Sequence, residues 1–273
     1  MKKSILGLSL LLAAAGAQAA LCVFVDKDTV CTFATDTTGG QAVYANPTNL
    51  SNIGSGSIKP FLGLQENGTE SGVSTDTPIV NLLPLNDKRD NANTFTRTFT
   101  RNDLAVIDLG GTSFYQFLLD TNEPSSAQQK MISIDTLRIW DAQSAAQQLL
   151  TRDNVTTLGT LDSLFSSLIY SMGPLNNVLM DGTLFSGSGL GYDLSVFIPV
   201  SAFANVAMDS RLIFGTGLGG LEGAGADATS AGGFEEWAYV AAVTAVPEPS
   251  EWALMLAGLA VVGGVAKRRQ AAR

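Results

Sequence analysis

The stretch SFYQFLLD, residues 113–120, decides the fold class of this chain. In an extended strand, successive side chains point to opposite faces, so these residues divide into two sets. Both sets are apolar except for Gln116 in one of them. A strand that is apolar on both faces is expected to be buried on both sides, inside a core made of other strands.

Other runs along the chain have the same character. They alternate or are β-branched, and Gly, Asn, Asp or Ser residues separate them: TFTRTFT (94–100), LAVIDLGG (104–111), SIDTLRIW (133–140), YDLSVFIP (192–199), RLIFGTG (211–217) and FEEWAYVAAV (234–243). Helical signals are confined to residues 142–150 and one turn at 201–205, while 163–170 fits a helix or a strand. We therefore predict an all-β body, an antiparallel β-sandwich of jelly-roll type with short helices.

Two segments have the composition of surface loops. Residues 46–56 are rich in Asn, Ser and Gly and have no periodicity, and residues 215–233 are rich in Gly. We predict that both lie outside the strands.

The N-terminus has the order of features found in a secretory signal peptide. Lys2 and Lys3 precede an apolar stretch, and Ala17 and Ala19 supply the small residues that signal peptidase recognises. We predict a signal helix over residues 1–19 and cleavage between Ala19 and Ala20. The alternative is an uncleaved N-terminal membrane helix or a buried core helix.

Cys22 and Cys31 are the two cysteines of the chain. In an exported protein, an even number of cysteines favours a disulfide. The turn-like residues 26–28 lie between two strand-like pieces, so a short hairpin would bring the cysteines together. The alternative is two unpaired thiols near the new N-terminus.

The charge distribution excludes one class of partner. The chain has a net charge of −9 with 16 basic residues. Six of the basic residues lie in the two terminal segments, so the body is more acidic than the whole chain. Such a surface repels nucleic acid, and we predict no nucleic-acid partner.

Histidine is absent from the sequence, which excludes Ser-His-Asp and Cys-His nucleophilic sites and the commonest zinc ligand. Two facing carboxylates could still form a glycosidase site. Asp120, Glu123 and Asp135 are candidates that could meet across strands. Solvated surface acids are the favoured interpretation. We therefore predict a protein that is not an enzyme, with a secreted carboxylate-dependent glycoside hydrolase as the alternative.

Two further groups of residues are candidate binding sites. Asp120, Asn122 and Glu123 form an oxygen-rich turn that suits a structural calcium ion, and we expect no other cofactor. A second oxygen-rich turn lies at 26–28. The Trp140 and Trp237 rings, with Arg138 near the first in sequence, could stack on sugars, but core packing is the favoured role for tryptophan.

The C-terminal stretch VPEPSEWALMLAGLAVVGGVAKRRQAAR, residues 246–273, reads as a membrane signal. Pro247 and Pro249 prevent the last strand from continuing. An uncharged apolar run over 252–266 would form a helix about 22 Å long, somewhat shorter than the hydrocarbon core of about 30 Å. The basic tail 267–273 would stay in the cytoplasm and leave the body outside. The expected anchor residues are Trp252, Leu254, Leu256, Leu259, Val261, Val262, Lys267, Arg268 and Arg269.

This tail closely resembles the PEP-CTERM sorting signal of Gram-negative bacteria, with the tripeptide Pro247-Glu248-Pro249 ahead of the apolar run and the basic end. The resemblance implies recognition of the tripeptide by an exosortase, a transient anchor in the inner membrane, and release to the cell surface or to exopolysaccharide. FYQFLLDTNEP, ISIDTLRIW and GFEEWAYV in the body are similar to β-sandwich ectodomains of other PEP-CTERM proteins, which bring no assigned activity.

The predicted organisation has three parts: a signal peptide (1–19), an extracellular β-sandwich (20–245) and a sorting signal (246–273). The predicted function is that of an exported, exosortase-processed protein of the surface or the extracellular matrix. Its sandwich would have a structural, adhesive or glycan-binding role.

Overall fold

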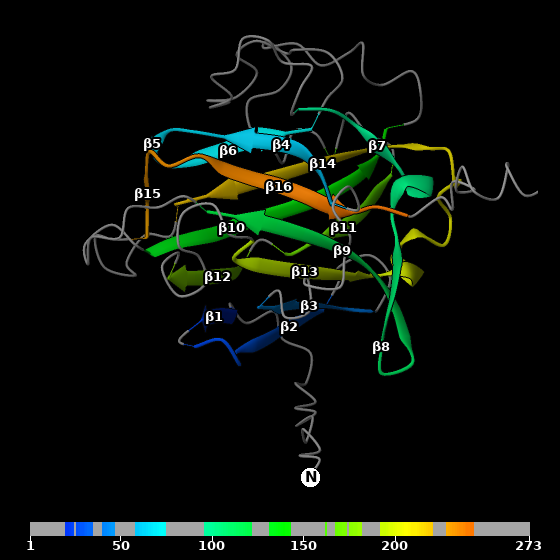
Figure 1. The fold of residues 1–273 in the computed structure, drawn as a ribbon, viewed down its shortest axis with the longest axis horizontal. Coiled ribbons are helices and arrows are strands. Elements are labelled where there is room, and N and C mark those ends of the chain that lie inside the picture. Colours follow the sequence, from blue (N-terminus) through cyan, green and yellow to red (C-terminus); the bar gives the residue numbers. More distant parts are fainter. Residues whose placement is uncertain are drawn as a thin grey trace, which may run out of the picture. The chain divides into compact units, whose positions relative to one another are not determined.

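The fold is described from a computed structural model of the chain (Figure 1). The chain divides into two compact units, Met1–Ala241 and Ala242–Arg273, and the elements below belong to the first. The predicted signal peptide and sorting signal lie outside the described residues. The structure describes residues 20–24, 26–34, 40–46, 58–74, 96–121, 131–142, 162, 167–173, 175–181, 192–220 and 228–242.

Most of the described strands belong to two large sheets. In the first sheet the strand order is β1 (Ala20–Phe24), β12 (Asn176–Asp181), β10 (Met131–Asp141), β14 (Arg211–Leu218) and β6 (Glu70–Val73). Two short strands complete this sheet: β11 (Leu168–Ser171) pairs with β10, and β7 (Phe99–Thr100) pairs with β14.

In the second sheet the strand order is β2 (Val30–Ala34), β3 (Gln41–Ala45), β13 (Leu194–Pro199), β9 (Thr112–Asp120), β16 (Glu235–Val240) and β4 (Ile58–Leu64). Strand β8 (Val106–Leu109) forms a hairpin with β9 through Gly110 and Gly111, both of which have positive φ. A separate pair joins β5 (Asn67–Gly68) to β15 (Ser230–Ala231). The paired strands are antiparallel except for β1 and β12, which are parallel.

The two sheets face each other across one shared core. The Phe61 ring of β4 in the second sheet lies 4.9 Å from Phe99 and 5.1 Å from Phe214, both in the first sheet. The hydroxyl oxygens of Tyr44 and Tyr170, which also belong to opposite sheets, are 2.7 Å apart and hydrogen-bonded. Contacts of this kind define a two-sheet sandwich whose apolar side chains interdigitate.

Strand β9 confirms the prediction made for SFYQFLLD. Its residues from Phe114 to Leu119 are all buried. Tyr115, Phe117 and Leu119 face the shared core, while Leu118 packs with Ala238 and Val240 on the outer face of the second sheet. The strand is therefore buried on both faces, as its sequence indicates.

Several other predicted strands are also present. The runs at 104–111, 133–140, 192–199, 211–217 and 234–243 contain β8, β10, β13, β14 and β16. Of the run at 94–100, only Phe99–Thr100 forms a described strand. The ambiguous segment 163–170 contains the start of β11.

The predicted turn at 201–205 corresponds to the 3-10 turn η5 (Val200–Phe203), and another such turn, η2, covers Arg101–Asp103. Residues 143–150, most of the predicted short helix, lie outside the described residues.

The prediction of a loop over 215–233 is wrong at its start and near its end, where Ser230 and Ala231 form β15. Gly215 and Gly217 belong to β14 and pair with Val73 and Ser71 of β6. A strand tolerates glycine where its neighbours supply the packing, and Thr136 lies beside Gly217.

Within the described ranges, no helix has the length and apolar character needed to span a bilayer.

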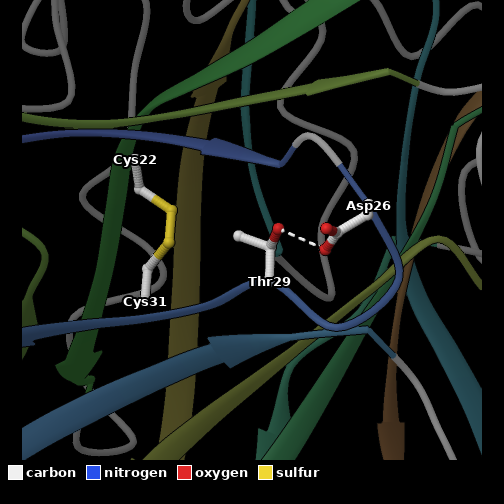
Figure 2. The surroundings of a disulfide bond; sticks show 4 residues. All are labelled: Cys22, Asp26, Thr29 and Cys31. Carbon is white, nitrogen blue, oxygen red and sulfur yellow. Dashed lines mark hydrogen bonds between the residues drawn. A yellow bond between two sulfur atoms is a disulfide. The ribbon is translucent and has the colours of Figure 1, made fainter. Parts of the chain in front are cut away.

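A disulfide joins Cys22 and Cys31, as predicted (Figure 2). The two Cα atoms are 6.1 Å apart, within the usual range for a disulfide. Between the cysteines, the Asp26 carboxylate accepts hydrogen bonds from the Asp28 amide and the Thr29 hydroxyl, at 3.0 and 2.9 Å, which fixes the turn.

The predicted hairpin around this disulfide is wrong. Strand β1 pairs with β12 in the first sheet, and β2 pairs with β3 in the second. The disulfide therefore links the edge strands of opposite sheets. The two strands do not form a ladder with each other, because each pairs with a strand of its own sheet.

The shared core gives a first prediction. Phe61→Ala should lower the free energy of unfolding by about 3–5 kcal/mol, because it removes a fully buried ring that contacts both sheets. Urea denaturation followed by circular dichroism measures this change. Leu109→Ala, at a side chain that is 40% exposed, should change stability by no more than about 0.5 kcal/mol. Equal effects of the two substitutions would contradict the proposed core.

The disulfide gives a second prediction. Cys22→Ala/Cys31→Ala should lower the free energy of unfolding by about 2–3 kcal/mol, because the open chain gains entropy in the unfolded state. The same denaturation experiment with reductant should destabilise the wild-type protein by a similar amount and leave the double variant unchanged. A wild-type stability that is insensitive to reductant would contradict the disulfide's role.

Candidate functional site

A group of acidic residues gathers on the outer face of the second sheet, where β9 ends. Asp120 is the last residue of β9, and Glu236 of β16 lies opposite it in the ladder. Asp193 comes directly before β13, the strand on the other side of β9. The strand order β13-β9-β16 therefore brings together three acids from distant parts of the sequence. Asp120, Asp193, Glu236 and the neighbouring Tyr192 are called the outer acidic cluster.

Asp193 is the fixed member of this cluster. Its Oδ2 accepts hydrogen bonds from the backbone amide and the hydroxyl of Thr121, both at 2.7 Å. Its own amide donates to the carbonyl of Leu119 at 2.7 Å. Asp193 has no exposed surface, so these bonds hold a buried carboxylate beside the end of β9.

Burial and neighbouring charges both act on the titratable groups of the cluster. Burial, followed by the charges of Asp193 and Glu236, raises the pKa of Asp120 from 3.8 to about 6. Burial also raises the pKa of Tyr192 above its usual value, and the nearby Glu236 and Asp120 raise it further. The Tyr192 hydroxyl, which stays protonated, donates a hydrogen bond to Glu236.

A hard cation needs several oxygen ligands that all reach one point. Within the described ranges, no three His, Cys, Asp or Glu residues form a group that could hold a metal ion. Of the predicted calcium ligands, Asp120 lies in the outer acidic cluster, while Asn122 and Glu123 are outside the described residues. Sequence reasoning missed Asp193 and Glu236 because only the strand order places them beside Asp120.

The carboxylates considered for a glycosidase do not all come together. Asp120 ends β9 of the second sheet, and Asp135 lies in β10 of the first. The Asp135 carboxylate accepts hydrogen bonds from the Gly220 amide at 2.7 Å and the Ser133 hydroxyl at 3.0 Å. Alternation along the strands places both acids on outer faces of the sandwich, where the core separates them.

The tryptophans considered for sugar stacking are buried. Trp140 and Trp237 have no exposed surface, as the core-packing interpretation predicts. Trp140 Nε1 donates to Asp162 Oδ1 at 2.9 Å, and Arg138 forms an ion pair with the same carboxylate. Every Phe, Tyr and Trp in the described part of the chain is buried or half-buried, so this part offers no exposed ring to a sugar.

Comparison with known proteins does not assign the chain to a family. No family model matches the sequence, and neither a curated protein nor a solved structure is significantly similar to it. The predicted processing and anchor residues lie outside the described residues, so they stay predictions.

The raised pKa of Asp120 gives a prediction about pH. The folded protein holds this proton up to about pH 6, whereas the unfolded chain loses it near 3.8, so the contribution of Asp120 to stability falls as pH rises between these values. In EDTA, Asp120→Asn should therefore match the wild type near pH 4 and exceed it by up to about 1 kcal/mol near pH 8. Denaturation curves across this range measure the difference.

Asp209→Asn, at an exposed carboxylate, serves as the matched control and should show no such divergence from the wild type. A stability gap between wild type and Asp120→Asn that stayed constant with pH would contradict the raised pKa of Asp120.

Proposed function

We propose that this chain is an exported, exosortase-processed protein of a Gram-negative bacterium that reaches the cell surface or the extracellular matrix. Its body would have a non-catalytic structural, adhesive or glycan-binding role. Signal peptidase and exosortase are the proposed processing partners. Between the two cleavages the inner membrane holds the chain. After release, exopolysaccharide is the proposed partner.

One structural observation carries this proposal. The Cys22–Cys31 disulfide lies directly after the predicted cleavage site, and β1 begins at Ala20, the residue that cleavage would make the N-terminus. Disulfides persist in oxidising compartments outside the cytoplasm. The fold and the proposed route of export therefore agree, and the Pro247-Glu248-Pro249 tripeptide with its apolar run and basic tail supports the later steps.

We also propose that the sandwich is a jelly roll. The support is the nested order of eight strands, β4, β6, β9, β10, β12, β13, β14 and β16, divided equally between the sheets. The first of them pairs with the last, β6 pairs with β14, β9 with β13, and β10 with β12. Such pairing of early strands with late ones is typical of the two Greek keys of a jelly roll.

Within the functional proposal, a structural or adhesive role has more support than aromatic stacking on glycans, because the described part of the chain offers no exposed ring. We retain structural calcium at Asp120, Asn122 and Glu123 as a proposal. Its support is the oxygen-rich turn that these residues form in the sequence, because hard cations prefer several oxygen ligands.

Mass spectrometry of the mature protein from its own host tests the proposed route. With the exosortase present, the chain should begin at Ala20 and end near Pro247-Glu248-Pro249. Without the exosortase, it should keep its C-terminal segment and stay in the membrane fraction. Glu248→Ala should block the C-terminal cut, whereas Glu251→Ala, outside the tripeptide, should not.

An unprocessed C-terminus in both strains would refute the sorting route. The glycosidase alternative has its own test, which is incubation of the mature protein with host exopolysaccharide. Release of new reducing ends by the wild type, lost in a carboxylate variant such as Asp120→Asn, would favour the hydrolase over the non-catalytic role.

A further inference from the structure

Four residues with polar side-chain atoms face the shared core near the β5–β15 end of the sandwich, and none of them has any exposed surface. Glu70 and Thr216 come from β6 and β14 of the first sheet, and Glu235 and Trp237 come from β16 of the second. They are called the interior polar corner. The outer acidic cluster is distinct from it, because Glu236 follows Glu235 in the strand and points to the opposite face.

Strand alternation and register place these side chains on the inner faces. Thr216 lies between the core residues Phe214 and Leu218, and Glu70 pairs with Leu218 in the ladder. In β16, Glu235 lies two residues before Trp237 and so shares its face. The Trp237 ring packs 4.8 Å from that of Phe214, so the two sheets meet at this point.

The strand ends that carry these residues converge on the β5–β15 pair. Gly219, which follows β14 directly, lies against Gly68 and Ser230, one from each strand of that pair. Glu70 begins its strand two residues after Gly68, and Glu235 follows Ser230 by a few residues. Both glutamates therefore belong to the same end of the sandwich.

Two members of the corner have buried polar atoms that lack a hydrogen-bond partner. Thr216 Oγ1 and Trp237 Nε1 are fully buried, and neither has a hydrogen-bond partner. Buried polar atoms normally have partners, because an orphaned group loses its hydration without compensation. Neither group bonds directly to a carboxylate of the corner, so an occupant that bridges these groups would satisfy them.

We propose that the interior polar corner binds a calcium ion. Glu70 and Glu235 bring two carboxyl groups into the core from opposite sheets, and a divalent cation bound between them would balance the charge of both carboxylates. Carboxylate and hydroxyl oxygens are the ligands that calcium prefers, so Thr216 supplies a third ligand. The Trp237 N–H donates to a ligating carboxylate or to a bound water and so orients the ligands. An anion is excluded by the two carboxylates.

The ion gives the sandwich a second cross-link. The disulfide joins β1 and β2, which lie at one edge of each sheet, whereas Glu70 lies in β6 at the opposite edge of the first sheet. A calcium ion between Glu70 and Glu235 ties that edge to the second sheet. This inference stands independently of the sorting route, because its residues belong to the body alone.

Calcium titration of the full-length chain in detergent, after removal of metal with EDTA, tests the proposal. The melting temperature of the wild type should rise with calcium concentration, because the ion binds only the folded state. Glu70→Gln and Glu235→Gln should each lose bound calcium and its stabilising effect at this site. In EDTA both should be at least as stable as the wild type, because a neutral amide replaces a buried charge. Trp237→Phe should weaken calcium binding about 10- to 100-fold.

Two controls separate this site from other effects. Glu66→Gln, in the connection just before β5, should keep the full calcium response. Asp120→Asn should keep the interior response even if the outer acidic cluster binds calcium as well. The proposal is overturned if both glutamine variants keep the wild-type calcium response, if the wild type binds no calcium, or if Asp120→Asn alone abolishes the response. Glutamine variants that are equally destabilised in EDTA and in calcium would also overturn it, since that result indicates a metal-independent role.

Discussion

The aromatic contacts between the two sheets are the interaction on which the rest of the structure depends. Phe117 of β9 lies 5.8 Å from Phe99 and 5.4 Å from Phe214, and Phe61 of β4 contacts all three rings. Buried rings contribute more area to a core than other side chains, and edge-to-face pairs add directional preference. These contacts hold the sheets face to face, and strand order and register then decide which polar residues meet.

Both candidate sites follow from this arrangement. Because β9 lies between β13 and β16, the outer face collects Asp120, Asp193 and Glu236 at one end of the second sheet. The next residue in β16, Glu235, points inward by alternation and joins the interior polar corner. The two adjacent glutamates of the FEEW sequence therefore lie on opposite faces of the same sheet, Glu235 in the core and Glu236 on the outer face.

The sequence predicts the central strands well, because their signal is local. Alternation and β-branched residues identify β9, β10, β13, β14 and β16 without knowledge of their partners. Strand β4 was not predicted, because Pro60 and Gly63 interrupt its pattern. Pro60 is tolerated because β4 is an edge strand of the second sheet and its ladder with β16 shifts register beside Pro60. The buried role of Trp237 follows from its residue type alone.

What the sequence does not contain is long-range pairing. The parallel ladder of β1 with β12 joins segments more than a hundred residues apart, so the Cys22–Cys31 loop resembles a hairpin until the sheets are known. The same limitation hides the outer acidic cluster, where Asp193 reaches Thr121. For the same reason the sequence does not predict the interior polar corner. Glu70 and Glu235 have the residue type of surface acids, and only the strand register shows that both side chains face the core.

The central claim is that β9 lies in the middle of a two-sheet core and is buried on both faces. Native-state hydrogen exchange, read by mass spectrometry on peptides that cover the body, tests it most directly. Amides of β9 and its partners β13 and β16 should exchange slowest, at rates set by global unfolding, while the β8–β9 turn at Gly110 and Gly111 exchanges fast. Exchange in β9 that is as fast as in that turn would contradict the account.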